Sequence, residues 1–93
     1  MSEKEQRITL IKQCLTHQLA PTHLEVIDES HQHAGHLQAG QGGHFIVTIV
    51  STQFTGKTLI QRHRMVYEAV GELMNTAIHA LSIHAYSPDE FSF

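Results

Sequence analysis

The stretch HFIVTIVSTQFTGKTLIQRHR, residues 44–64, decides the fold of this chain. Residues 45–50 are apolar and rich in β-branched side chains but too few for a helix, which predicts a buried strand. Residues 51–57 are loop formers, and Gly56 among them can adopt the positive φ that a tight reversal requires. From residue 58 the spacing of apolar residues becomes helical. The stretch therefore predicts a strand, a turn and a helix in direct succession.

A helix over residues 3–19 and two further strands complete the predicted set of elements. Apolar side chains of the first helix recur on one stripe, and Pro21 ends it. Residues 23–30 form a short alternating strand with Leu24 and Val26 on one face, and residues 78–86 alternate as a longer strand. The stripe comprises Ile8, Ile11, Leu15 and Leu19, with Leu10 and Cys14 at its edge, and Cys14 is interpreted as a core residue rather than a reactive thiol.

The second helix is predicted over residues 58–74, weakened only slightly by Gly71. Its apolar face is predicted to comprise Leu59, Val66, Val70 and Leu73, flanked by Met65 and Ala69. Its outward face is predicted to carry Arg62, Glu68 and Glu72. The inward face of the last strand is predicted to comprise His79, Leu81, Ile83 and Ala85. Ser87-Pro88-Asp89-Glu90 is predicted to form a terminal turn.

The element order α-β-β-α-β predicts a two-layer α+β domain spanning residues 1–93. The strand–helix–strand connection should link parallel strands, and the preceding hairpin should add an antiparallel pair. We therefore expect a three-stranded mixed sheet with both helices on one face.

Composition narrows the function classes. The formal net charge of -3 argues against a domain held to nucleic acid by bulk charge. No apolar run approaches the roughly 20 residues of a membrane span, and the charged start lacks a signal region. The single cysteine suits a reducing compartment. The expected location is the cytoplasm.

Nine histidines in 93 residues are the one functional hint in the composition, because imidazole is the commonest metal ligand. His31, His33 and His36 lie in the glycine-rich segment 31–43, between two predicted strands. Long loops of this kind are often functional, yet this histidine spacing alone matches no closed zinc pattern. The segment is either a loop with solvated imidazoles or a loop that offers a metal ligand.

Motifs in order along the chain resemble those of the BolA family, whose fold resembles a class II KH domain. They are LEVIDES from Leu24, HF-x-V and a serine from His44 to Ser51, FTGK from Phe54 to Lys57, LI-x-RHR-x-VY from Leu59 to Tyr67, and IHAL from Ile78 to Leu81 before SPDE. The matching stretch begins at Leu24 and covers nearly all of the chain that follows. The set is specific in its order and spacing.

The resemblance implies a partnership with a monothiol glutaredoxin that holds or transfers a [2Fe-2S] cluster. In the family the histidine of the IHA motif is a ligand, here His79, and a second ligand comes from the loop, at His33 with His31 and His36 as alternatives. Glutaredoxin would offer a cysteine thiolate and bound glutathione a second thiolate, and two imidazoles would complete the other iron, as in Rieske centres. This role belongs to iron–sulfur and iron homeostasis. No cluster is expected in the isolated protein.

The resemblance also implies an alternative, a DNA-binding transcriptional regulator of stress response and cell morphology. The nucleic-acid surface would comprise Lys57, Arg62, His63 and Arg64. The same cluster could instead be a solvated helix face or the surface that docks glutaredoxin. The G-x-x-G loop by which KH domains clamp a nucleic-acid backbone is missing between the predicted helices. No nucleophile–base motif, Walker loop or H-E-x-x-H is present in the sequence, so a non-catalytic binding protein is predicted.

Overall fold

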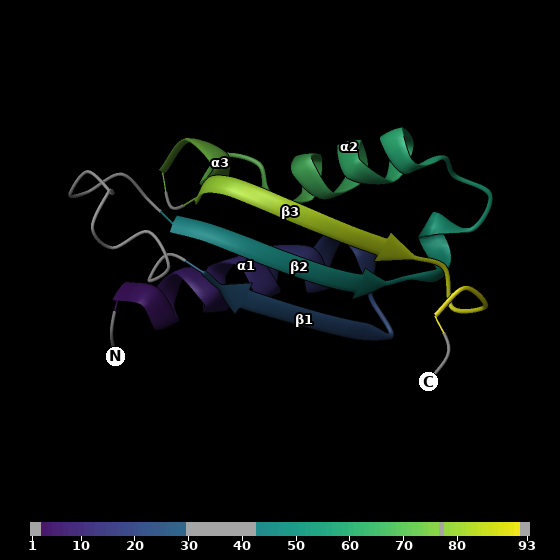
Figure 1. Ribbon diagram of the computed structural model, residues 1–93, viewed down its shortest axis with the longest axis horizontal. Coiled ribbons are helices and arrows are strands. Elements are labelled where there is room, and N and C mark those ends of the chain that lie inside the picture. The colour runs from purple at the N-terminus through teal and green to yellow at the C-terminus, as the bar shows by residue number, and fades with distance from the viewer. Residues whose placement is uncertain (1–2, 30–42, 77, 92–93) are drawn as a thin grey trace.

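Three strands form one mixed sheet, and helices cover one of its faces, in the computed structural model shown in Figure 1. The structure describes residues 3–29, 43–76 and 78–91. In chain order the elements are α1 (Glu3–Leu19), β1 (His23–Asp28), β2 (Gly43–Val50), the 3-10 turn η2 (Thr52–Phe54), α2 (Leu59–Val70), α3 (Leu73–Thr76) and β3 (Ile78–Tyr86). The predicted α+β class is confirmed. The loop histidines His31, His33 and His36 lie outside the described residues.

The strand order is β1-β2-β3, with β1 antiparallel and β3 parallel to β2. The crossover through α2 therefore links parallel strands, as predicted. A row of buried residues crosses the sheet, because Val26 pairs with Val47 and Val47 with Ile83. Figure 1 shows α1 behind the sheet, while the opposite face of the sheet is turned to the viewer.

Alternation along the strands sends one set of side chains into a core between the sheet and the helices. From α1 this core takes Ile11, Leu15 and Leu19, which confirms the predicted stripe. Cys14 is half-buried, so it lies at the margin of the core rather than inside it. Phe54, in the turn that follows β2, is fully buried and was not predicted as a core residue. The turn thus contributes to the core as well as reversing the chain.

The second helix differs from the prediction because Gly71 ends it. Gly71 has φ 53° and ψ -124°, and its N–H donates to the Tyr67 carbonyl. The α2 helix therefore ends at Val70, and the chain forms a separate short helix, α3, after the glycine. A left-handed φ favours glycine, since a Cβ would clash with the following carbonyl. At the other end the predicted apolar residue Leu59 is 67 % exposed. Thr58 and Gln61 form a capping box that fixes this start.

A one-residue shift in register interrupts the pairing of β2 and β3 at His79. Gly43 pairs with Ile78, yet the next residue, His44, pairs with Ala80. His79 is therefore the extra residue of a β-bulge, a feature found next to many functional sites. The predicted inward face holds at Ile83 and Ala85, which are buried, while the side chain of His79 lies outside the described part of the structure. The inward placement of the His79 side chain therefore stays a prediction.

Candidate functional site

The first predicted functional residue that the structure places is Arg62, and it does not lie on the surface. Its side chain is 8 % exposed. Nε donates to the Lys57 carbonyl at 2.9 Å, and Nη1 donates to the Ala85 carbonyl at 3.1 Å. The prediction that Arg62 faces outward is wrong, while its assignment to a nucleic-acid or partner surface stays untested. The guanidinium instead joins the start of α2 to the end of β3.

Glu90 completes the surroundings of Arg62 with a bidentate ion pair. Nη1 lies 2.6 Å from Oε1, and Nη2 lies 3.2 Å from Oε2. The Ser87 backbone N–H also donates to Oε1 at 2.9 Å. These donors, the Arg62 guanidinium before the Ser87 N–H, lower the pKa of Glu90 from 4.5 to about 2. The hydrogen bond to Glu90 in turn raises the pKa of Arg62 above its ordinary value.

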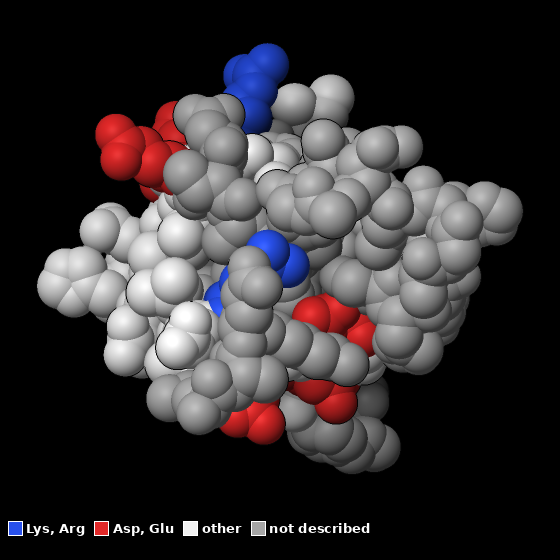
Figure 2. Space-filling model, turned by 90° about the vertical axis from the view of Figure 1, so that its left-hand side faces the viewer, with Lys and Arg blue, Asp and Glu red and all other residues white. Residues whose placement is uncertain are grey.

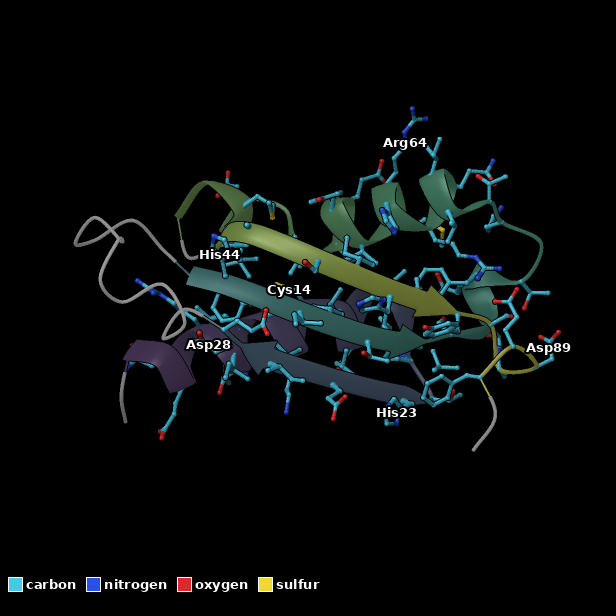
Figure 3. All side chains as sticks on the ribbon, in the orientation of Figure 1. Cys14, His23, Asp28, His44, Arg64 and Asp89 are labelled. Carbon is cyan, nitrogen blue, oxygen red and sulfur yellow. The ribbon has the colours of Figure 1, made fainter. Side chains whose placement is uncertain are left out.

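Lys57, His63 and Arg64 remain as the accessible part of the predicted basic cluster. Lys57 and Arg64 are exposed, and His63 is half-buried. Figure 3 shows Arg64 pointing away from the sheet on the outer side of α2. Two large apolar side chains near the start of this helix are also exposed, Leu59 at 67 % and Ile60 at 66 %. The outer surface of α2 therefore combines basic and aliphatic groups.

The second predicted site lies at the end of the sheet where β2 and β3 begin. His79 is the bulge residue there, and His44 pairs with Ala80 directly beside it. Figure 3 places His44 and Asp28 at this end and His23 and Asp89 at the other. The chain segment with the three loop histidines joins β1 after Asp28 and β2 before Gly43, at the same end. His44 is a further histidine of this neighbourhood, and the sequence analysis named it only as part of the HF-x-V motif.

The described part of the chain does not by itself provide a set of side chains that could coordinate a metal ion. Residues 3–29, 43–76 and 78–91 contain no group of three or more His, Cys, Asp or Glu side chains able to hold a metal ion. Cys14, the single cysteine, lies on α1.

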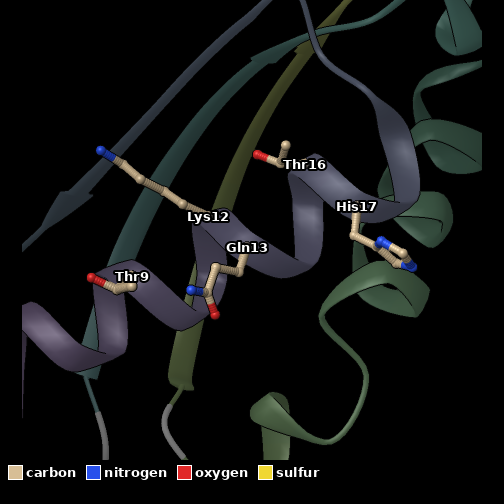
Figure 4. A pocket seen from close by; sticks show the side chains of 5 residues that line it. All are labelled: Thr9, Lys12, Gln13, Thr16 and His17. Carbon is tan, nitrogen blue, oxygen red and sulfur yellow. The ribbon is translucent and has the colours of Figure 1, made fainter.

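The end face seen in Figure 2 does not separate charge by sign. Among the described residues that it shows, acidic and basic side chains are interspersed. Such mixing gives little of the attraction by which an extended basic surface binds a polyanion. A hollow of about 550 Å³ on the outer side of α1, shown in Figure 4, is lined by polar side chains that include Lys12 and His17. The residues that line this hollow include none of the predicted site residues.

Comparison with known proteins decides the family. The BolA-like protein family matches residues 15–90. This chain belongs to the BolA-like family. It is 44 % identical over 71 residues to the DNA-binding transcriptional regulator BolA of Escherichia coli, covering 76 % of this chain and 66 % of the regulator. It is 42 % identical over 92 residues to Protein BOLA1, chloroplastic, of Arabidopsis thaliana, covering 92 % of this chain and 56 % of that protein.

The solved structure of BolA1 from Arabidopsis thaliana shares the fold of this BolA-like protein, with a TM-score of 0.79 at 37 % identity. The match covers 92 % of this chain and 96 % of that one. The names of these relatives denote a regulator and BolA proteins, and none of them denotes an enzyme. One relative is named as chloroplastic, so the cytoplasmic location stays a prediction. None of the helices in the described ranges has the length and apolarity that a bilayer crossing requires.

Sequence reasoning missed the role of the C-terminal turn. Glu90 binds Arg62, the arginine of the RHR motif that faces inward, and the Ser87 N–H donates to the same carboxylate, yet only a terminal turn was predicted there. A signal was available, because a serine followed three residues later by a glutamate is the pattern of a capping box. The glutamate does reach back to the serine N–H, and it holds the arginine as well.

Proposed function

We propose that this BolA-like protein pairs with a monothiol glutaredoxin to hold or transfer a [2Fe-2S] cluster, with His79 as one ligand and His33 as the other. The observation that carries the proposal is the β-bulge at His79. A bulge re-aims a side chain that regular pleating would fix, at a modest cost in pairing. A histidine as the extra residue gives the sheet a feature that its own stability does not require.

Topology supports the pairing of His79 with a loop histidine. β1 ends and β2 begins at the end of the sheet where β3 carries its bulge. β1 and β3 flank β2, so they are separated by about 10 Å in the sheet. His33 follows Glu29 by four residues, a length of chain that reaches at most about 14 Å. The tether therefore permits His33 to approach His79, and the alternative His36 has a longer tether, while the two residues from Glu29 to His31 reach at most about 7 Å.

The donor chemistry also supports a shared centre. Two neutral imidazoles suit one iron of a [2Fe-2S] cluster, and this chain has only one cysteine, which lies half-buried on α1. Glutaredoxin and its bound glutathione would supply the thiolates. Because imidazole must be deprotonated to ligate, such a centre should weaken as the pH falls.

The test is reconstitution of the mixed complex with a monothiol glutaredoxin, iron, sulfide and glutathione. His79→Ala is expected to change the visible absorption and circular-dichroism spectra and to lower the iron content of the complex. His84→Ala is the matched control, because His84 lies on the same strand with an exposed side chain. Single alanine substitutions at His31, His33 and His36 identify the second ligand. An unchanged spectrum with His79→Ala would rule out the ligand assignment.

A second candidate function is DNA binding, which the names of relatives such as the Escherichia coli regulator favour. Since Arg62 is neutralised by Glu90, Lys57 and Arg64 would carry the phosphate contacts. Two such contacts predict a slope of about -1.8 for log K against log salt concentration. Fluorescence anisotropy of labelled duplex DNA at several salt concentrations measures it. Binding that survives Lys57→Glu combined with Arg64→Glu would exclude this surface.

A further inference from the structure

The carboxylate of Glu90 accepts hydrogen bonds from two other residues. Three N–H donors converge on it, from Nη1 and Nη2 of Arg62 and from the Ser87 backbone, at 2.6, 3.2 and 2.9 Å. A planar guanidinium edge with an added backbone N–H is the arrangement by which proteins bind carboxylate and phosphate groups. The occupant here is a side chain of the same molecule.

The donors are held in place independently of Glu90. Arg62 is anchored by the Lys57 and Ala85 carbonyls. Ser87 is 2 % exposed and directly follows β3, whose last residue, Tyr86, accepts a hydrogen bond from the Ser51 N–H. The donors would therefore keep their positions if the Glu90 carboxylate moved away, so the site is preorganised for another oxyanion.

The occupant is less constrained than the site. The side chain of Glu90 is 45 % exposed, and a rotation about its own bonds is enough to carry the carboxylate into solvent. The neighbouring residue Phe91 stays packed meanwhile, since its ring stacks on His23 at 5.0 Å. Release of the carboxylate thus requires no unfolding of the C-terminal turn.

We propose that Arg62 and the Ser87 N–H form a latent binding site for a carboxylate or phosphate group, which Glu90 fills as an intramolecular competitor. An external oxyanion gains the site only by displacing Glu90, whose tether gives it an effective concentration of the order of millimolar or above. A monovalent anion in solution then competes poorly. An oxyanion presented by a bound partner, whose own effective concentration is also high, competes well.

Chemical rescue of Glu90→Ala tests this site. Acetate and inorganic phosphate are titrated separately, with chloride at the same ionic strength as reference, while NMR follows the Arg62 Nε–H and the Ser87 amide. Saturable shifts of both signals in Glu90→Ala, with the wild type unchanged over the same range, are expected. The stronger of the two responses shows whether the site prefers carboxylate or phosphate. Equal responses to acetate, phosphate and chloride would overturn the proposal.

Two further variants keep the experiment decisive. Asp89→Ala removes the same charge from the neighbouring residue, which bonds the Ser87 hydroxyl and not Arg62, and should show no rescue. Glu90→Gln keeps an oxygen acceptor and so preserves the fold if Glu90→Ala is unstable, and the anions should then bind with lower affinity than in Glu90→Ala. If Glu90→Ala is unfolded, refolding by acetate but not by chloride supports the site. If neither Glu90→Ala nor Glu90→Gln responds to acetate or phosphate, the proposed oxyanion site is overturned.

Discussion

The two ends of the sheet differ in how their polar residues are used. Where β2 and β3 end, polar groups are paired inside the fold: Ser51 donates to the Leu19 carbonyl at 2.7 Å, and Arg62 binds two carbonyls and Glu90. Where the same strands begin, the register shifts by one residue at a histidine. The first end uses its charged residues for stability. The second end carries a β-bulge, a feature found next to many functional sites.

Among the substitutions that test this comparison, Phe54→Ala should have the largest effect on the free energy of unfolding. Phe54 follows β2 at the well-paired end and is fully buried. Truncating a buried phenylalanine leaves a cavity and should lower the free energy of unfolding by about 3–5 kcal/mol. Urea denaturation followed by circular dichroism measures the loss. A change below about 1 kcal/mol would show that the turn is not part of the core.

Arg62→Ala and Arg64→Ala, two residues apart, form the next test. Arg62→Ala removes the donors of two main-chain carbonyls and should lower the free energy of unfolding by about 2 kcal/mol. Arg64 is exposed, so its substitution should change stability by no more than about 0.5 kcal/mol. The same denaturation experiment compares them. Equal losses would contradict the division of roles within the RHR motif.

Gly56→Ala should cost about 1 kcal/mol, because Gly56 has φ 77° and an added Cβ meets no atom within 4 Å. The cost is therefore conformational and not steric crowding. Gly56→Asn is the matched control, since asparagine tolerates the left-handed region better and should lose less. If alanine and asparagine destabilise equally, backbone strain is not the cause.

The smallest expected effect is a pH-dependent one at Glu90. Its pKa in the folded state is about 2, below the ordinary 4.5, so the pair with Arg62 stabilises the fold fully above pH 4.5 and progressively less as the pH falls toward 2. Wild type should therefore melt a few degrees above Glu90→Gln at pH 7, and the gap should narrow below pH 4.5. Thermal melts across this range measure it. A gap that is constant with pH would mean that charge is not involved.

Sequence patterns predicted the elements better than the roles of individual side chains. Periodicity located α1 and all three strands, since burial repeats along each element. It did not place Arg62, because the residue that neutralises an inward-facing arginine lies 28 positions away and no local pattern specifies such a distance. Leu59 fitted the helical stripe, yet it is exposed although Val66, two turns later on the same face, is buried.

Only those residues of the candidate site that belong to family motifs could be predicted from the sequence. The IHAL motif identified His79, but the bulge that sets this histidine apart depends on the register between two strands. Regular alternation alone had predicted that this side chain faces inward. The loop histidines could be named but not ranked from sequence, because a glycine-rich segment has no periodicity from which positions in space can be inferred.

The bulge also means that β3 is one residue longer than its pairing with β2 demands. Without position 79, Ile78 and Ala80 would be consecutive and would still face Gly43 and His44, giving an unbroken ladder. A protein shortened by this residue should therefore retain its architecture while losing the imidazole. A single codon deletion would then remove the imidazole at position 79 without changing the architecture, which makes the extra residue an addition to an otherwise complete scaffold.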